Sequence, residues 1–307
     1  MEESEILKKY KLSKKEHEKY YTNIKKAYIR GKKTVKNPIA VIIGGQTGAG
    51  KCGLINYSKK IFKDSNVIII NGDEIRLFHP KSKEIARLYP DLYTKITCQD
   101  SNLWTKKLFK ELRKKRFNII FEGTMKNNII ATESITELQQ LGYIVIVRGL
   151  AVSDLESRIS ILERYEEQVN QNGWGRLVIP EQHNETYKGM PETINYIEKE
   201  KKYDILEIFS RGENPEKPIT IYAKYDLEKK EYIEKIIKEN LEYKTICQYE
   251  SAKEAVLKTR EIESNKIRLT LNKRIVAVLK SMKKRKATEK EKKIVLDLLA
   301  YYQTIKK

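Results

Sequence analysis

The sequence predicts an α/β fold in which a parallel sheet has helices on both faces, with helical extensions at both ends of the chain. Short, β-branched apolar runs suited to buried strands alternate with stretches of helical spacing. Both terminal segments are polar and carry apolar residues at helical intervals. We expect strands at 39–43, 67–70, 117–121 and 143–147, and helices at 53–62 and 103–116.

The first elements follow from the spacing of apolar residues along the chain. Residues 4–30 carry apolar side chains at helical intervals, which predicts a helical lead-in. Residues 39–43 read Ile-Ala-Val-Ile-Ile, a composition typical of a strand buried on both faces. Helical spacing returns at 53–62, and the run Val-Ile-Ile-Ile at 67–70 predicts the next strand.

The later elements repeat the alternation. A helical stretch at 103–116 leads into the predicted strand at 117–121, and the run Tyr-Ile-Val-Ile-Val at 143–147 predicts a fourth. The tail from residue 264 alternates apolar and basic positions, so we expect amphipathic helices packed on the core. We therefore divide the chain into a basic helical lead-in, a core with a lid, and a basic, mainly helical C-terminal region, at residues 1–36, 37–215 and 216–307.

Composition limits the class of protein. Of 307 residues, 40% are hydrophobic and 34% are charged, and no apolar run approaches the roughly 18 residues that a membrane span needs. The acidic start, Met1 to Glu5, has no apolar segment behind it, so we expect a cytoplasmic protein without membrane contact. The cysteines Cys52, Cys98 and Cys247 are odd in number and form no C-x-x-C pair, which argues against a disulfide framework and a zinc site.

The net charge of +20 is unevenly distributed. Residues 1–37 carry +7 and residues 264–307 carry +11, which leaves +2 for residues 38–263. A nucleic-acid substrate would require basic residues along the central segment, so this distribution disfavours one. The basic ends are compatible with an acidic protein partner, with weak nucleic-acid contact, or with solvated lysine-rich helix faces.

One short run predicts a phosphate-binding loop. It fits the pattern G-x-x-x-x-G-K-[ST] except at its last position, and it follows a predicted strand and precedes a predicted helix, as the pattern requires. Its backbone N–H groups and lysine would bind the phosphates of a nucleotide at the start of the helix. The alternative is a glycine-rich turn without a ligand. The residues are Gly45, Gln46, Thr47, Gly48, Ala49, Gly50, Lys51 and Cys52.

The mismatch in this run falls on a predicted metal ligand. Cys52 stands where a serine or threonine hydroxyl usually binds Mg²⁺. A thiol is a soft and poor ligand for this ion. Water could fill the coordination position instead, or catalysis could be weakened.

Polar residues directly follow the second and third predicted strands. Asp73 comes after the strand at 67–70, and Glu122-Gly123-Thr124 comes after the strand at 117–121. Because the carboxyl ends of parallel strands meet at one edge of a sheet, these residues should face the phosphate loop. Asp73 is the better candidate for a catalytic base. The alternatives are a helix N-cap for Asp73 and a structural hydrogen bond for Glu122.

Two arginines, Arg164 and Arg176, lie 12 residues apart around a glycine-containing loop. Phosphoryl transfer needs positive charge near the transferred group, and arginines on a mobile lid often supply it. Most arginines are instead surface ion-pair partners, and spacing alone leaves that alternative open.

Taken together, five motifs resemble the zeta toxins, a family of bacterial toxin–antitoxin kinases. The resemblance covers roughly residues 30–215 in unbroken order. It implies a P-loop NTPase-like or kinase-like core that uses ATP and Mg²⁺ to phosphorylate the 3′-hydroxyl of the aminosugar in UDP-N-acetylglucosamine, blocking cell-wall precursor synthesis. The motifs are Gly-Gly-Gln-Thr-Gly-Ala-Gly-Lys (44–51), Asn-Gly-Asp-Glu-Ile-Arg (71–76), Phe-Glu-Gly-Thr (121–124), Glu-Arg-Tyr-Glu-Glu (163–167) and Pro-Glu-Gln-His-Asn (180–184).

The resemblance also implies roles for individual residues. Lys51 would bind the β- and γ-phosphates, and Asp73 would accept the proton of the sugar hydroxyl. Arg164 and Arg176 would bind the ATP phosphates. The residues expected to contact the substrate are Glu122, Thr124, Lys126, Asn102 and Lys106.

Two of these positions depart from the family pattern. Lys126 stands where an arginine is frequent, and Lys106 stands where we expect a carboxylate that contacts the nucleotide sugar. The charge reversal at Lys106 favours an altered acceptor, such as another nucleotide sugar or a small metabolite.

Three functions therefore stay open. The first is a zeta-type kinase, and the second is a P-loop kinase of another acceptor, including a nucleic-acid 5′-hydroxyl. The third is a catalytically weak nucleotide-binding module that engages a partner, which the Cys52 thiol favours. The resemblance further implies an antitoxin protein that inhibits the kinase.

Overall fold

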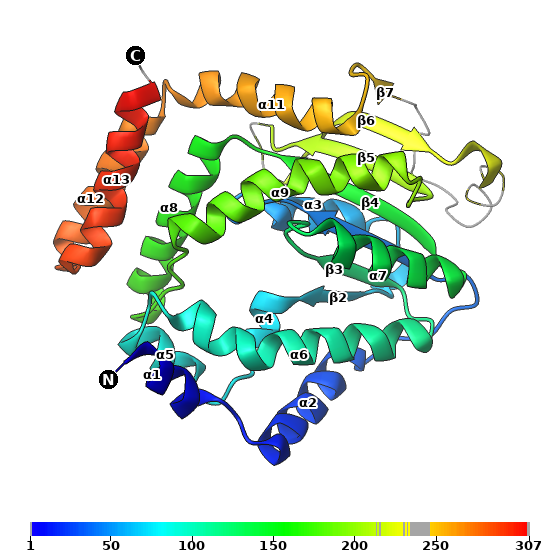
Figure 1. Cartoon of the computed structure of the whole chain (residues 1–307), viewed down its shortest axis with the longest axis horizontal. Helices are drawn as coiled ribbons and strands as arrows, with labels where there is room; N and C mark the ends of the chain where they lie inside the picture. The colour runs from blue at the N-terminus through cyan, green and yellow to red at the C-terminus, as the bar shows by residue number, and fades with distance from the viewer. Residues whose placement is uncertain are drawn as a thin grey trace.

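A mixed sheet forms the centre of the protein, in a computed structural model that describes residues 2–305 apart from residues 213, 215, 230, 232 and 234–245 (Figure 1). Part of the predicted C-terminal region therefore lies outside the described residues. The described strands are β1 (Ile39–Gly44), β2 (Ile68–Asn71), β3 (Ile119–Glu122), β4 (Ile144–Ala151), β5 (Ile205–Ser210), β6 (Ile219–Tyr225) and β7 (Ile246–Cys247).

The strands lie in the order β2-β3-β1-β4-β5-β6-β7. Strands β1 to β5 are parallel to their neighbours, with Ala40 opposite both Ile119 and Val145. This confirms the predicted parallel sheet. The last two strands are antiparallel, and we predicted neither these two strands nor the parallel strand β5. Because β6 pairs with β5 along most of its length, the sheet continues past residue 215, where we expected the core to end.

Both faces of the sheet are covered, because alternate residues of each strand point to opposite sides. On β1, Ala40 and Ile42 belong to an apolar cluster with residues of five helices, α2 (Lys14–Ile29), α6 (Tyr93–Lys114), α7 (Asn128–Gln140), α9 (Pro180–Lys199) and α11 (Ala252–Ile267). Val41 and Ile43 belong to a second cluster, which includes Leu54 of α3 (Lys51–Lys59). The predicted placement of helices on both faces is confirmed.

The helices connect successive strands and extend the chain at both ends. Short 3₁₀ helices, η1 (Lys63–Ser65) and η2 (Leu227–Lys229), add to them. The described α-helices are α1 (Glu3–Tyr10), α2 (Lys14–Ile29), α3 (Lys51–Lys59), α4 (Gly72–Arg76), α5 (Ser82–Leu88), α6 (Tyr93–Lys114), α7 (Asn128–Gln140), α8 (Asp154–Asn172), α9 (Pro180–Lys199), α11 (Ala252–Ile267), α12 (Leu271–Lys284) and α13 (Glu289–Ile305).

Two of the C-terminal helices, α12 and α13, pack against α8 at one end of the molecule. Figure 1 shows α12 and α13 side by side against α8, with α11 running back over the sheet. Apolar residues join them, with Leu155 and Ile159 of α8 packed against Leu271 and Ile275 of α12. No described helix combines the length and apolar character that a membrane span requires.

Candidate functional site

The predicted phosphate loop connects β1 to α3, in the strand–loop–helix order that the pattern requires. Gly48 and Gly50 have φ angles of +83° and +87°, in the left-handed region that favours glycine. A Cβ at Gly48 would lie 2.1 Å from the backbone oxygen of Ser157. The loop is therefore pressed against α8, and a side chain at Gly48 would push the two apart.

Lys51 folds back over the loop. Its Nζ donates hydrogen bonds to the backbone oxygens of Gly45 (3.0 Å) and Gln46 (3.2 Å) and lies 3.5 Å from Glu122 Oε1. Burial lowers the pKa of Lys51; the Glu122 charge opposes this shift, and the charge of Arg164 adds to it. Several cations thus gather around one loop, an arrangement that suits a polyanion.

Arg164 lies on α8 with buried donors that lack a partner. Its Nε and Nη2 atoms are buried and have no hydrogen-bond partner among the described residues. Burial lowers the pKa of Arg164, and the neighbouring Cys52 and Glu122 oppose that shift. Buried N–H donors are normally satisfied, so this guanidinium is suited to receive the oxygens of a ligand.

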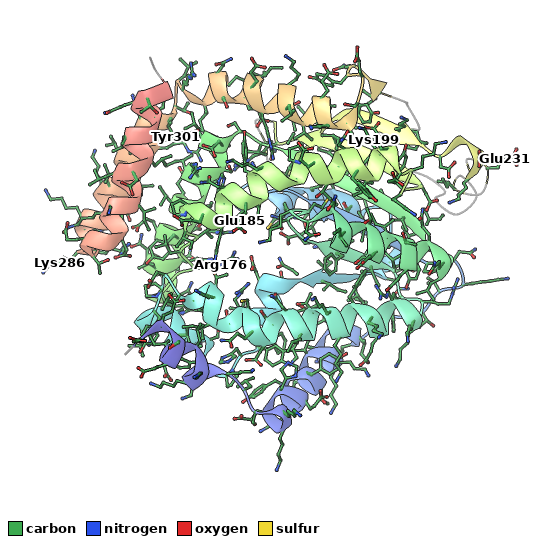
Figure 2. The ribbon with its side chains drawn as sticks, in the orientation of Figure 1. Arg176, Glu185, Lys199, Glu231, Lys286 and Tyr301 are labelled. Atoms are coloured by element: carbon green, nitrogen blue, oxygen red, sulfur yellow. The ribbon has the colours of Figure 1, made fainter. Side chains whose placement is uncertain are left out.

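Arg176 reaches the same site from the segment that follows α8. The residue is labelled in Figure 2, and its Nη1 donates to the carboxylate of Asp73. Burial lowers the pKa of Arg176 to about 10. Both predicted arginines are therefore brought to the edge of the sheet that carries the phosphate loop.

Asp73 lies in the first turn of α4. The side chain of Asn71 accepts the backbone N–H of Asp73 at 2.8 Å, so Asn71 is the N-cap of this helix. The alternative in which Asp73 is the N-cap is therefore wrong. The Asp73 carboxylate, 43% exposed, instead accepts hydrogen bonds from Arg76 (3.3 Å) and Arg176.

Glu122 ends β3 opposite Asn71, which ends β2. Asn71 Nδ2 donates to Glu122 Oε2 at 2.5 Å, and Lys51 lies against the other oxygen. We did not predict Asn71 as a site residue, although it is the first polar residue after an apolar strand. Thr124 follows two residues later and is partly buried.

The other predicted substrate residues lie on the surface. Asn102 and Lys106 are exposed and lie about one turn apart on α6. Lys126 forms an ion pair with Glu185 at 2.7 Å, and both side chains are more than half exposed. The structure thus brings together Lys51, Asp73, Glu122, Arg164 and Arg176 but places Asn102, Lys106 and Lys126 at the solvent boundary.

Gln46 is a loop residue whose side chain points into the protein. Its Nε2 donates to the backbone oxygen of Val152 (2.7 Å), and its Oε1 accepts a hydrogen bond from Arg260 Nη2 of α11 (3.1 Å). The side chain is fully buried. We predicted that Gln46 binds nucleotide. Its side chain instead anchors the loop, so only its backbone N–H is left to face a ligand.

A further cation, Arg211, was not predicted. It follows β5, and a Cβ at Gly50 would lie 3.4 Å from its Nε. Arg211 Nη1 donates to Glu156 Oε1 (2.8 Å) and to Ser160 Oγ (2.9 Å), both on α8. Arg211 belongs to none of the five motifs. The only sequence pattern that could have indicated it as a site residue is its position directly after an apolar strand.

A buried Ser–His–Asp trio lies beside the loop. Ser157 Oγ is 2.8 Å from His183 Nε2, and His183 Nδ1 is 3.6 Å from Asp154 Oδ1. Ser157 and His183 are at most 1% exposed, so no substrate reaches the hydroxyl. Gln46 Nε2 also donates to Ser157 Oγ (3.4 Å), which indicates that the trio supports the loop.

The residue after Lys51 does not fit a side-chain ligand for Mg²⁺. Cys52 is a free, exposed thiol in the first turn of α3. Asp73 and Glu122 offer hard oxygens, but each is already paired with cations. No group of three or more His, Cys, Asp and Glu side chains in the described part of the chain could hold a metal ion.

Comparison with protein-family models identifies the family of this chain. The family model described as Zeta toxin matches residues 23–224, about two thirds of the chain. The chain belongs to the zeta toxin family. The match to the family model ends before α11.

Similar zeta toxins come from streptococci and enterococci. The chain is 29% identical over 186 residues to Toxin zeta of Enterococcus hirae, which covers 60% of this chain and 64% of that protein. It is 31% identical over 183 residues to Toxin PezT of Streptococcus pneumoniae, which covers 59% and 70%. The chain thus matches less than two thirds of the length of the Enterococcus toxin.

Solved structures share the fold. A structure from a study of the PezAT chromosomal toxin-antitoxin system of Streptococcus pneumoniae has a TM-score of 0.66 at 23% identity, covering 88% of this chain and 99% of that one. The native AvrRxo1-ORF1:-ORF2 complex has a TM-score of 0.50 at 15% identity, covering 75% and 73%. At these identities the likeness concerns the fold alone.

Proposed function

We propose that this zeta toxin family member transfers the γ-phosphoryl group of ATP to a small-molecule acceptor. The proposed acceptor atom is the 3′-hydroxyl of the aminosugar in UDP-N-acetylglucosamine, and its phosphorylation would block cell-wall precursor synthesis. One observation carries the proposal: Lys51, Arg164 and Arg176 gather at a glycine loop, with a carboxylate, Asp73, beside them.

Phosphate binding would rearrange the contacts of the cations. Lys51 would exchange its hydrogen bonds to the carbonyls of Gly45 and Gln46 for phosphate oxygens. The unpartnered donors of Arg164 would be satisfied by the same oxygens. These charges would stabilise the negative charge that spreads over the transferred group, which is the main demand of phosphoryl transfer.

Asp73 would act as the base. In the protein alone its carboxylate pairs with Arg176. When the guanidinium turns to the phosphates, Asp73 Oδ2 becomes free to orient the sugar hydroxyl, while Arg76 keeps its contact with Oδ1. The hydroxyl oxygen then forms a bond to the γ-phosphorus, the bond to the β–γ bridging oxygen breaks, and the hydroxyl proton passes late to Asp73.

Glu122 and Thr124 would hold the sugar, and Asn102, Lys106 and Lys126 would contact the rest of the nucleotide sugar. Lys106 is exposed at the place where we expected a carboxylate. This basic residue favours a second candidate, a kinase of the same mechanism that acts on a different anionic acceptor. We propose that Mg²⁺ enters bound to ATP, with phosphate oxygens and water as its ligands, because Cys52 offers sulfur.

We further propose an antitoxin partner and a bacterial cytoplasmic location. The structure with a TM-score of 0.66 comes from a toxin-antitoxin system, and this supports such a partner. The basic lead-in, residues 1–37 with a net charge of +7, suits an acidic antitoxin. Equal binding by a variant with a reversed-charge lead-in would contradict the role of this charge.

The test is incubation with ATP, Mg²⁺ and a panel of sugar nucleotides and small metabolites, followed by mass detection of an added phosphate. We expect UDP-N-acetylglucosamine to gain one phosphate with the wild-type protein and none with Lys51→Ala. Phosphate on another acceptor alone would favour the second candidate. ATP binding without transfer to any acceptor would reject the kinase and favour a nucleotide-binding module.

A further inference from the structure

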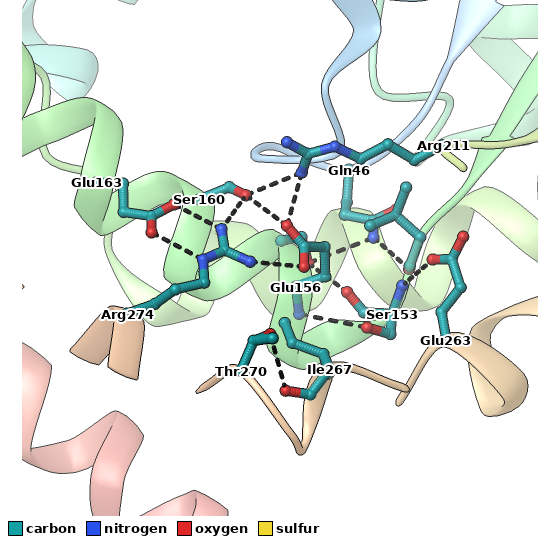
Figure 3. Close-up of polar contacts among 12 residues, drawn as sticks. Gln46, Ser153, Glu156, Ser160, Glu163, Arg211, Glu263, Ile267, Thr270 and Arg274 are labelled. Carbon is teal, nitrogen blue, oxygen red and sulfur yellow. Dashed lines mark hydrogen bonds and ion pairs between the residues drawn. The ribbon is translucent and has the colours of Figure 1, made fainter. Parts of the chain in front are cut away.

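The helix that carries Arg164 is bound along its outer side by an arginine of the C-terminal region. Arg274 of α12 donates from Nε and Nη2 to the carboxylate of Glu163 (2.7 and 2.5 Å) and from Nη1 to Glu156 Oε2 (2.7 Å) (Figure 3). Glu156 and Glu163 are seven residues apart, on one face of α8. One guanidinium therefore spans two turns of this helix.

A second arginine binds the same helix further along. Arg285, at the end of α12, donates from Nη2 to Glu166 Oε1 (2.5 Å) and to Glu291 Oε1 of α13 (2.7 Å). Arg164 thus lies between the two attachment points. Apolar contacts between α8 and α12 tolerate small sliding movements, whereas bidentate arginine–carboxylate pairs have a fixed geometry.

The position of the Arg164 side chain depends on the position of α8, because its buried N–H donors form no hydrogen bond with a described residue that would fix it. Its buried Nε and Nη2 atoms have no partner in the described structure. The position of the guanidinium is therefore set by the helix backbone. A cavity of about 1100 Å³ lies beside these ion pairs, and its lining includes Glu156, Arg211 and Arg274. Because this space is not filled by packed side chains, the ion pairs are what connects α12 to α8 at this point.

The same contacts extend to the phosphate loop. Glu156 accepts hydrogen bonds from Arg274 on Oε2 and from Arg211 on Oε1, and Ser160 accepts from both arginines (Figure 3). Arg211 in turn lies beside Gly50. Three successive contacts therefore connect Arg274 to the loop, and Arg274 binds the helix that carries Arg164.

We propose that Arg274 is a positioning residue that holds α8 so that Arg164 stays aimed at the transferred phosphoryl group. The inference rests on the proposed function for its kinetic consequence. Residue 274 lies beyond residue 224, where the match to the family model ends.

Amide hydrogen exchange tests, independently of activity, whether Arg274 stabilises α8. The variants are Arg274→Gln, the milder Arg274→Lys, and a matched control, Lys273→Gln, which removes the same charge from an exposed position of α12. We expect the amides of residues 156–166 to exchange about tenfold faster in Arg274→Gln, to change less in Arg274→Lys and to be unchanged in the control. Unchanged exchange in Arg274→Gln would overturn the inference.

A double-mutant cycle tests whether Arg274 affects catalysis through Arg164. We expect Arg274→Gln to lower kcat for ATP turnover with UDP-N-acetylglucosamine about tenfold, with the KM for ATP within about twofold of wild type. In an Arg164→Ala background the same substitution should cause no further loss. Losses that multiply would overturn the inference, since Arg274 would then act independently of Arg164. A wild-type protein without turnover would reject the proposed function, while the exchange rates would still decide whether Arg274 holds α8.

Discussion

The guanidinium of Arg176 donates a hydrogen bond to the carboxylate of Asp73, although 103 residues separate them in the chain. Both are predicted to act in phosphoryl transfer. In the protein alone, Asp73 compensates the charge of Arg176, and the carboxylate is shared with Arg76. In the proposed reaction ATP breaks this pair, which couples nucleotide binding to the release of the base.

Replacing Asp73 with asparagine tests the base. Asparagine keeps the size of the side chain but accepts no proton, so we expect kcat to fall about 100- to 10,000-fold with ATP still bound. Phosphoryl transfer is measured by mass detection and ATP binding by calorimetry. The neighbouring exposed residue gives the control, Glu74→Gln, which should keep the wild-type rate. A near-normal rate for Asp73→Asn would remove Asp73 from the mechanism.

Replacing Lys51 with alanine tests the phosphate site. The substitution removes a buried ammonium group and should reduce kcat/KM for ATP at least about 100-fold. It also leaves Glu122 without its cation, so circular dichroism and thermal unfolding must show that the variant stays folded. Lys60→Ala, at the exposed end of the same helix, is the control. Comparable losses in the two variants would contradict a specific role.

Replacing Cys52 with serine tests the metal position. A hydroxyl is a hard ligand, and we expect the Mg²⁺ concentration for half-maximal rate to fall about tenfold, equal to ~1.4 kcal/mol of ion binding. The rate is measured over a Mg²⁺ titration. Cys98→Ser, which changes the free cysteine on α6, should leave the titration unchanged. Identical titrations for wild type and Cys52→Ser would show that the ion does not approach this residue.

The stability of the protein should depend on Glu263 between pH 5 and pH 7. Burial raises the pKa of Glu263 to about 7, while its carboxylate accepts the backbone N–H of Ser153 at 3.2 Å. Its pKa is higher in the folded than in the unfolded chain, so the native state binds the proton more tightly. The stabilisation is fully present below the unfolded pKa and is lost as the pH rises towards 7.

Glu263→Gln isolates this effect. From pH 5 to pH 7.5 the wild-type free energy of unfolding should lose on the order of 2 kcal/mol relative to the variant, measured by urea unfolding at both values. His183 acts in the opposite direction, because burial, aided by Arg158, lowers its pKa to about 4, and this contribution weakens as the pH falls below 6.5. It is the same in both proteins and cancels in the comparison. Parallel pH dependences would contradict the prediction for Glu263.

Local sequence patterns predicted four of the five parallel strands that the structure describes, all except β5, and the phosphate loop. The strand at 39–43, the glycines after it and Asp73 are each specified by neighbouring residues, so a short window is sufficient. Arg164 and Arg176 required the family resemblance, because nothing in their own segments distinguishes a buried arginine from a surface one. Their burial depends on the packing of α8 against the loop.

The unpredicted places of Arg211 and of the Gln46 side chain depend on contacts between distant segments. Arg211 has no motif, and its place beside Gly50 follows from the pairing of β5 with β4. Strand β6 carries exposed as well as buried residues, so its apolar signal is weaker than that of a strand buried on both faces. The inward direction of Gln46 depends on Arg260, which is 214 residues away.

The separation of Gln46 and Arg260 along the chain also affects when the phosphate site can form during translation. A ribosome that adds ~5–20 residues per second needs roughly 10–40 s to proceed from one residue to the other. Once residue 184 has been added, the nascent chain contains every motif of the phosphate site, but until residue 260 is added it lacks the side chain that binds Gln46 Oε1. The fully anchored site therefore forms only when most of the chain has been translated.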